Sequence, residues 1–260
     1  METIASPANP RIKYVKRIQN DRRFRRREGL FAIETERWLA DSLDQGWQPT
    51  LLLCSEAWAE TPAGKDLLAR VTAPTLLITP ALLRDLSETQ TPAGFLALLP
   101  IPAPPPPANP DLLLILDQIR DPGNLGTIIR AAAAAGASAV VLTPGSVDPY
   151  NPKVVRATMG TLARLPLLEL DWPEINARWP DLPAYMATGA ADLSYDELDW
   201  RQPAALIIGG EADGASEAAR ARATGRIKIE MANEVESLNA AMACSIILFE
   251  AARQRRRRPE

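Results

Sequence analysis

The sequence predicts an α/β protein whose C-terminal half contains a mostly parallel sheet. After residue 110, six short apolar runs lack strict apolar–polar alternation, as is typical of strands buried on both faces. Helical patterns separate most of these runs, which favours strand–helix–strand units. A stretch with seven prolines, "PIPAPPPPANP", lies between Pro100 and Pro110 and favours a stiff, extended spacer. We therefore predict a small α/β domain over 1–99, a linker over 100–110 and a larger domain over 111–260.

Elements of the first domain alternate from its N-terminus onward. A basic segment over 10–20 predicts the first helix, and short apolar runs predict the strands. The predicted strands cover 30–34, 49–56, 75–79 and 94–99. The other predicted helices cover 36–46, 64–71 and 81–88.

The second domain is also predicted to contain strands that alternate with helices. The predicted strands cover 111–119, 138–143, 164–170, 184–189, 204–210 and 226–231. Helices are predicted over 124–136, 152–163, 173–179 and 215–222. The last helix, 237–257, is the longest and is apolar around much of its girth, which predicts burial against the sheet or a partner subunit.

The composition excludes several classes of chemistry. The 260 residues contain no histidine, which removes Ser-His-Asp and Cys-His nucleophiles and His-ligated zinc. We predict no metal site. The two cysteines, Cys54 and Cys244, lie in apolar surroundings and are interpreted as buried thiols. Because no apolar run reaches the roughly 20 residues that span a bilayer, we expect no membrane association and a cytoplasmic location.

Charge is distributed unevenly along the chain. Residues 1–28 hold nine basic and three acidic residues, although the whole chain carries a net charge of −3. Basic clusters with interleaved aromatic rings suit a nucleic acid with exposed bases, because cations pair with phosphates and rings stack on bases. A solvated helix face is the alternative. The predicted RNA-binding residues are Arg11, Lys13, Lys16, Arg17, Arg22, Arg23 and Arg25.

The turn that follows the first strand of the second domain is a candidate dinucleotide-binding loop. That turn reads "DPGNLG" and does not supply the G-x-G-x-x-G spacing that lets the backbone approach a pyrophosphate. A G-x-x-x-x-G-K-[ST] loop is absent from the sequence as well. An ordinary nucleotide-dependent dehydrogenase is therefore a minor alternative.

Three polar islands follow apolar strands of the second domain. They contain Asn124 with Arg130, then Glu211, then Ser237 with Asn239. Because ligands of parallel sheets gather at the carboxyl ends of strands, the islands predict a shared site. Each island alone has a structural interpretation as a helix cap, an ion pair or a turn.

Together the islands resemble a known family. "NLGTIIRAAAAAGA", "LIIGGEADGAS" and "IKIEMANEVESLNAAMACSIILFEA" closely resemble, in order and spacing, the three motifs of SpoU-type (TrmH-like) RNA ribose 2′-O-methyltransferases of the SPOUT superfamily. "NPKVVRATMG", residues 151–160, resembles a further segment between the first two motifs. The basic N-terminal region resembles a substrate-binding domain related to ribosomal protein L30. The resemblance covers nearly the whole chain.

The resemblance implies an S-adenosylmethionine (AdoMet) site in a deep trefoil knot, a homodimer, and an RNA substrate, with ribosomal RNA favoured over transfer RNA. It implies that Arg130 acts on the ribose hydroxyl, oriented by Asn124, Glu211, Ser237 and Asn239. We favour a phosphate-gripping, charge-stabilising role for Arg130, because guanidinium holds its proton at neutral pH. Proton removal by Arg130 stays open. The implied cofactor-binding residues are Gly209, Ile229, Leu238, Met231, Ile208, Thr188 and Gly189.

Three positions depart from the family pattern. Gly210 stands where the family usually has Asn, Ala212 where it has Gly, and Glu230 where it has Pro. The loss of proline and the added charge put cofactor affinity in doubt more than reaction type. The alternative function is therefore an RNA-binding ribosome-assembly factor with a degenerate methyltransferase domain.

Overall fold

Two units make up the chain in the computed structural model, which describes residues 3–87, 89, 91–210, 214–233 and 235–256. Unit 1 comprises Met1–Pro102 and Asp148–Ala163, and unit 2 comprises Ala103–Val147 and Arg164–Glu260. The polypeptide therefore passes from one unit to the other three times. The first of these passages, between Pro102 and Ala103, falls within the predicted proline-rich linker.

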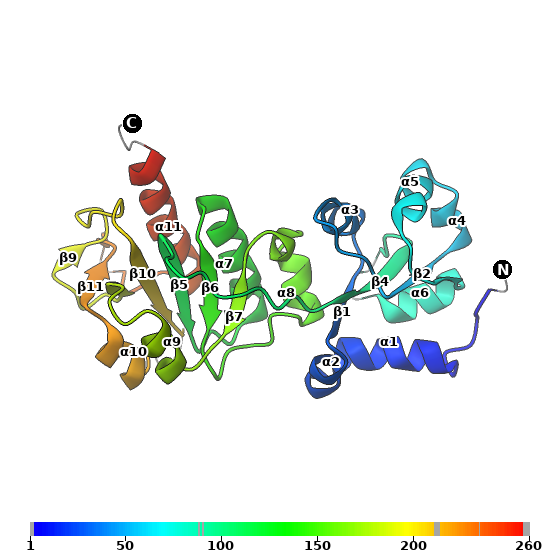
Figure 1. Cartoon of the computed structure of the whole chain (residues 1–260), viewed down its shortest axis with the longest axis horizontal. Coiled ribbons are helices and arrows are strands. Elements are labelled where there is room, and N and C mark those ends of the chain that lie inside the picture. Colours follow the sequence, from blue (N-terminus) through cyan, green and yellow to red (C-terminus); the bar gives the residue numbers. More distant parts are fainter. Residues whose placement is uncertain (1–2, 88, 90, 211–213, 234, 257–260) are drawn as a thin grey trace. The chain divides into compact units, whose positions relative to one another are not determined.

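Unit 1 is built around a four-stranded mixed sheet of order β1-β4-β2-β3 (Figure 1). β4 pairs antiparallel with both β1 and β2, and β2 pairs parallel with β3. The strands are β1 (Leu30–Ile33), β2 (Leu51–Cys54), β3 (Thr75–Leu77) and β4 (Phe95–Pro100). The helices are α1 (Pro10–Asn20), α2 (Arg22–Glu28), α3 (Glu36–Asp44), α4 (Glu56–Ala59), α5 (Pro62–Arg70), α6 (Pro80–Leu86) and α8 (Pro152–Ala157), with a 3₁₀ turn at Thr161–Ala163.

One face of this sheet is covered by α1, α2 and α6. Ile12, Val15 and Ile18 recur at helical spacing on α1 and are fully buried, so the opposite side of α1 carries its basic residues. They share a core cluster with Leu53 and Leu98 of the sheet. The apolar stripe of α1 thus fixes which of its residues can reach solvent.

Unit 2 contains a seven-stranded sheet of order β7-β6-β5-β10-β8-β11-β9, in which every described pairing is parallel (Figure 1). The central strands are fully buried, which explains their unbroken apolar sequence. The strands are β5 (Leu112–Asp117), β6 (Ala139–Leu142), β7 (Leu167–Glu169), β8 (Ala184–Ala187), β9 (Leu193–Ser194), β10 (Ala204–Gly209) and β11 (Gly225–Lys228).

Helices cover both faces of this sheet. α9 (Trp172–Arg178) and α10 (Glu217–Arg222) contribute to a core cluster with alternate strand residues such as Leu113 and Ile207. The intervening strand residues, such as Leu114, are equally buried, because α7 (Pro122–Ala135) and α11 (Ala240–Arg256) pack on the other face and against each other (Figure 1). The predicted α/β class with a parallel sheet is confirmed.

Most predicted elements are present, with three informative differences. The sequence reading missed α2, α4 and the two-residue strand β9, all of them short. The last helix begins at Ala240 rather than at Ser237, because Asn239 is the residue that caps it. Residues 148–163 fold with unit 1, although they lie within the sequence range predicted for the second domain.

Candidate active site and nucleic-acid interface

The carboxyl ends of β10, β8 and β11 bring three predicted cofactor positions together. The parallel register aligns Ile207 with Met186, which places Gly209 level with Thr188 on the neighbouring strand. Thr188 donates its N–H to the carbonyl of Ile227 at 2.9 Å. The pairing of β8 with β11 therefore continues past the end of β8, close to Ile229. Of the other predicted positions here, Ile208 is buried within β10 and Gly189 is exposed beyond β8. This edge is therefore lined by backbone and small or apolar side chains.

Backbone approaches at the end of β10 require glycine. A Cβ atom at Gly209 would lie 2.4 Å from the backbone nitrogen of Ala215, and one at Gly210 would lie 2.8 Å from the carbonyl oxygen of Gln118. Both distances are too short for a side chain unless the facing backbone shifts. Gly210, which departs from the family pattern, is therefore fitted to its surroundings in this chain.

Asn124 and Asn239 meet across the fold although 115 residues separate them. The Asn239 amide donates a hydrogen bond to the Asn124 side-chain oxygen at 3.0 Å. The Asn239 oxygen also accepts from the N–H groups of Ala241 (2.9 Å) and Met242 (3.3 Å) and so caps α11. Asn124 is not a cap, because Asp121 accepts the Asn124 N–H at 2.7 Å and caps α7. The structure thus joins the first and third predicted motifs through these two side chains.

Arg130 lies apart from this pair. It is the ninth residue of α7, about 12 Å along the axis from the helix start, and it is exposed on the same stripe as Thr127. Within the described part of the chain Arg130 makes no hydrogen bond or ion pair. The guanidinium is exposed and can be reached by a ligand.

The remaining predicted positions in the third motif are less closely connected. Ser237 is exposed in the irregular segment before α11, Leu238 is half-buried and Met231 is 37% exposed. Glu230 is exposed, and its carboxylate pairs with Lys228 Nζ at 3.0 Å. The charge that replaces the family's proline is thus partly neutralised at the surface. The predicted residue Glu211, like Ala212, lies outside the described residues.

Asp117 is a residue of this edge that the sequence reading missed. Its side chain is fully buried at the end of β5, and its carboxylate accepts three hydrogen bonds. The donors are Thr143 Oγ1 (3.0 Å), Trp172 Nε1 (3.2 Å) and the backbone nitrogen of Ser216 (2.6 Å). An acid directly after "LLLIL" was the available signal, because it places a polar group at the carboxyl end of a buried strand.

The basic surface of unit 1 lies on α1 and α2. Phe24 is buried against the core, and the guanidinium groups of Arg17 and Arg27 lie 4.1 Å and 4.7 Å from its ring centroid. The ring therefore organises two cations rather than offering a free stacking face. The predicted RNA-binding residues that are exposed are Arg11, Lys13, Arg17, Arg22 and Arg23.

Several predicted RNA-binding residues have partners within unit 1, among them Arg17, whose Nε lies 3.5 Å from Asp21 Oδ2. Lys16 pairs with Asp85 at 2.5 Å at the surface. Arg25 is 2% exposed, donates to Asp148 Oδ2 from Nε (2.9 Å) and from a terminal nitrogen (2.7 Å), and also donates to the carbonyls of Ile18 and Gln19. Buried guanidinium must be paired in this way. Arg25 is therefore corrected from an RNA-binding residue to a structural one.

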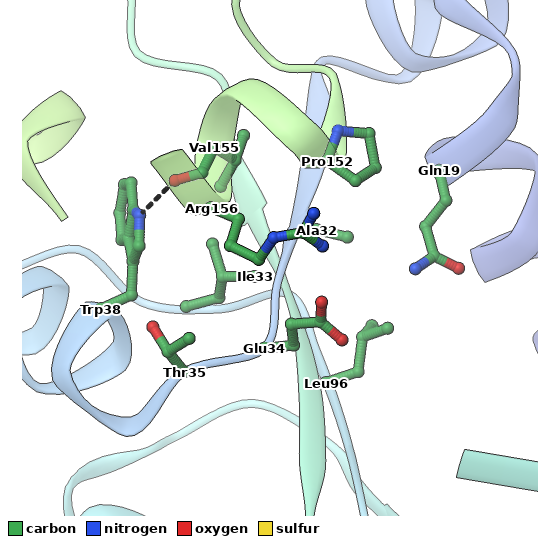
Figure 2. A pocket seen from close by; sticks show the side chains of 10 residues that line it. All are labelled: Gln19, Ala32, Ile33, Glu34, Thr35, Trp38, Leu96, Pro152, Val155 and Arg156. Carbon is green, nitrogen blue, oxygen red and sulfur yellow. Dashed lines mark hydrogen bonds between the residues drawn. The ribbon is translucent and has the colours of Figure 1, made fainter. Parts of the chain in front are cut away.

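Residues 148–163 are held on unit 1 by several contacts besides that ion pair. The Tyr150 ring lies 5.2 Å from the Phe31 ring. Figure 2 shows a second contact, in which the Trp38 indole donates to the carbonyl of Val155 at 3.3 Å. A cavity of about 20 Å³ lies beside this contact and includes Glu34 and Arg156 in its lining (Figure 2). That volume accommodates a single water molecule, so the cavity is not a ligand site.

A larger cleft of about 530 Å³ lies in unit 2, away from the predicted site. Its lining includes Pro110, Pro183 and Pro203, which lie one or two residues before β5, β8 and β10. The cleft is therefore at the amino ends of the strands, opposite the edge that carries Gly209. Among the described residues, no cluster of acidic, Cys or His side chains could hold a metal ion, and no helix is long and apolar enough to cross a bilayer.

Comparison with known proteins gives a family match in each half of the chain. Residues 111–249 match the SpoU rRNA Methylase family, and residues 9–97 match the MRM3-like substrate binding domain. The human mitochondrial rRNA methyltransferase 3 is 34% identical over 98% of this chain and 75% of its own length. The 23S rRNA (uridine(2479)-2′-O)-methyltransferase of Streptomyces viridochromogenes is 32% identical over 95% of this chain and 91% of its own length.

The fold is similar to that of a solved family structure. The SpoU methyltransferase AviRb from Streptomyces viridochromogenes, in complex with the cofactor AdoMet, superposes with a TM-score of 0.89 at 30% identity, over 96% of this chain and 99% of that one. Sequence and structure therefore agree over nearly the full length. The chain belongs to the SpoU rRNA methylase family.

Proposed function

We propose that the protein transfers the methyl group of AdoMet to a ribose 2′-hydroxyl of ribosomal RNA. The hydrogen bond between Asn239 and Asn124 is the observation that carries this proposal, because it joins two of the three motifs into one site. Both the human and the Streptomyces relatives carry rRNA methyltransferase names, and the second is named a 2′-O-methyltransferase.

The edge formed by β8, β10 and β11 fits AdoMet. Adenine needs a narrow apolar slot with backbone hydrogen-bonding groups, and the glycines and half-buried Ile229 supply both. Thr188, Gly189, Ile208 and Gly209 would line the slot from neighbouring strands, and Leu238 and Met231 would reach it from the segment before α11. The bound cofactor supplies an electrophilic methyl group, so the chain needs neither a metal nor a nucleophile of its own.

Arg130 is proposed to act on the RNA rather than on the cofactor. Its exposed guanidinium can grip a phosphate next to the reacting ribose and stabilise negative charge as the hydroxyl loses its proton. Asn124, Asn239, Ser237 and Glu211 would orient the ribose and Arg130. Because Arg130 is about 12 Å along α7 from the helix start, a partner protomer would present the cofactor to it.

A homodimer built on α11 is part of the proposal. Met242, Ile246 and Phe249 recur at helical spacing and form an exposed apolar stripe, each of them more than one-third exposed. α11 packs against α7, which carries Arg130. Covering the stripe with a second copy would bury three large side chains and bring a partner close to Arg130.

The trefoil knot and the L30-like identity of unit 1 are proposed on the family resemblance. A supporting observation for the knot is the close approach of Gly189 to the Glu236 backbone, where a Cβ at Gly189 would lie 3.8 Å from the Glu236 carbonyl. For unit 1, a mixed four-stranded sheet with helices and the match to a substrate-binding domain support an RNA-binding role.

The alternative of a degenerate assembly factor depended on Gly210 and Glu230. The nearby Gln118 carbonyl leaves no room for a Cβ atom at Gly210, and Glu230 is paired with Lys228 at the surface. Both departures are compatible with a working cofactor site, so an active enzyme is favoured over the assembly factor.

Transfer of tritiated methyl groups from AdoMet to unmodified rRNA, and separately to tRNA, tests the proposal. Nucleoside analysis should identify a 2′-O-methylated nucleoside in the rRNA sample. Modification of tRNA alone would redirect the substrate assignment. Protein that binds RNA but neither binds AdoMet nor transfers methyl groups would instead support the assembly factor.

A further inference from the structure

Asp117 connects four segments of unit 2 at the edge where the cofactor is proposed to bind. Its carboxylate belongs to the end of β5, and its donors come from the residue after β6 (Thr143), the first residue of α9 (Trp172) and the cap of α10 (Ser216). A buried carboxylate with fewer partners would be costly, so these contacts hold the four segments in one arrangement.

The same network fixes the backbone that follows Asp117. Thr143 Oγ1 donates to Asp117 and accepts the N–H of Gln118 at 3.1 Å, so its hydroxyl serves both residues. Gln118 has a φ of 59°, a left-handed conformation that costs energy for a residue with a side chain. The Gln118 carbonyl lies where a Cβ of Gly210 would be, at 2.8 Å. The strained Gln118 peptide thus packs directly against the backbone at the end of β10.

Asp117 also positions the segment that packs against Gly209, residues 214–216. Its shortest hydrogen bond, 2.6 Å, is to the backbone nitrogen of Ser216. Gly214 and Ala215, which directly precede Ser216, lie within 2.7 Å of a Cβ built on Gly209. One carboxylate therefore sets the backbone on both sides of Gly209 and Gly210.

We propose that Asp117 is a positioning residue for the cofactor site, which holds Gly209 and Gly210 in the conformation that binds AdoMet. This inference rests on the proposed function, because it assigns the β10 exit to the cofactor. Asp117 does not touch the substrate in this assignment. Asp117 affects the affinity for AdoMet. The affinity for RNA and the rate of methyl transfer in the bound complex depend on other residues.

Three variants isolate the bond to Ser216. Asp117→Asn keeps the shape but turns an amide N–H₂ group toward one of the donors. Ser216→Pro fits the φ of −65° at this position, removes the backbone donor and the side-chain cap, and places the proline ring carbon against the Asp117 carboxylate, which must move away. Ser216→Ala is the matched control, since it loses the cap to Ala219 but keeps the backbone N–H.

Calorimetric titration of AdoMet gives the deciding measurement. Asp117→Asn and Ser216→Pro should each raise the Kd for AdoMet at least about tenfold, the expected effect of losing a hydrogen bond to a charged group. Ser216→Ala should stay within about twofold, and the double variant Asp117→Asn/Ser216→Pro should be no worse than the weaker-binding single variant. The KM for AdoMet should rise with Kd, whereas kcat at saturating AdoMet and the Kd for RNA stay near wild type.

Two results would overturn the inference. One is a lower Tm for both variants with an unchanged Kd for AdoMet, which would make Asp117 a purely structural residue. The other is an equal loss of affinity in Ser216→Ala and Ser216→Pro; this comparison still decides if Asp117→Asn fails to fold. Wild-type protein that binds AdoMet but methylates no RNA would contradict the proposed function alone, because the AdoMet titrations remain valid.

Discussion

Asn239 donates one hydrogen bond to Asn124 and, with its oxygen, accepts two from the first turn of α11. One side chain therefore serves both helix formation and the link between two motifs. The two roles use different atoms, the nitrogen for the link and the oxygen for the cap. A substitution that alters only the nitrogen can separate them.

Asn239→Asp should preserve stability and reduce methyl transfer. A carboxylate still accepts from Ala241 and Met242, and negative charge at a helix N-terminus adds about 0.3–1 kcal/mol. It cannot donate to Asn124, so we expect turnover to fall by roughly tenfold or more. Asn239→Ala should lose turnover and, in addition, about 1 kcal/mol of unfolding free energy with the cap. Wild-type turnover in Asn239→Asp would remove the link from the mechanism.

Arg130→Ala should abolish transfer without affecting folding. The side chain is exposed, so the free energy of unfolding should change by no more than about 0.5 kcal/mol. Loss of charge stabilisation in the transition state should lower kcat by about 100-fold or more, with the Kd for AdoMet nearly unchanged. Thr127→Ala, on the same stripe of α7, is the control. Comparable losses in the two variants would assign the effect to the helix surface rather than to the guanidinium.

Phe249→Arg should convert the protein to a monomer. The substitution places a charge in the exposed apolar stripe of α11, where burial of each large side chain contributes about 1.5–3 kcal/mol. Light scattering coupled to size exclusion reports the change, and activity should fall with it. Leu193→Arg, at an exposed apolar residue away from the stripe, should leave the mass unchanged. A wild-type protein that is already monomeric would refute the proposed dimer.

Replacing Arg25 should lower the stability of the protein, whereas replacing Arg23 should weaken RNA binding and leave stability unchanged. Arg25→Met removes the close partner of buried Asp148, leaves only the longer contact of 3.8 Å to Arg26, and should cost about 3–5 kcal/mol in chemical denaturation. Adding Asp148→Leu should restore much of that loss. Arg23→Ala, at an exposed position on α2, should leave stability unchanged and lower the salt slope of RNA binding by about one. A stable Arg25→Met protein with weakened RNA binding would reverse our correction.

Cys54 should lose its stabilising contribution only at high pH. Burial raises the pKa of the Cys54 thiol from 9.0 to about 11, so the folded state favours the neutral thiol. The contribution is complete below the unfolded pKa near 9 and is lost as the pH rises toward 11. Wild-type protein should therefore lose more unfolding free energy over pH 9–11 than Cys54→Ala. Rapid labelling of native protein by a thiol reagent at pH 8 would show that the thiol is accessible.

Much of this architecture follows from the sequence because it depends on local periodicity. The unbroken apolar runs of β5 and β10 and the apolar stripe of α1 predict their own burial. The sequence also places Asn124 and Asn239 at strand-exit positions, which predicts that they share a site. It does not distinguish the buried Arg25 from the exposed Arg23 in "RRFRRR", because the carboxylate that pairs with Arg25, that of Asp148, is 123 residues away in sequence.

The Asp117 network could not be predicted from the sequence, because it also depends on long-range packing. The Asp117 network joins donors from three segments that are 26 to 99 residues distant in sequence. No local pattern marks Thr143 or the Ser216 nitrogen as partners of a carboxylate. Short elements such as α2 and β9 have too few residues to display a period.

The path of residues 148–163 limits how the chain can be dissected. Asp148, Tyr150 and Val155 complete the core of unit 1, yet on both sides they continue into strands of unit 2. A fragment cut at the proline-rich linker would keep Asp148 while discarding Arg25, and would strand α8 without the surface that buries it. The two halves are consequently not interchangeable modules. A chimaera that imports a foreign RNA-binding domain would have to import the 148–163 segment with it.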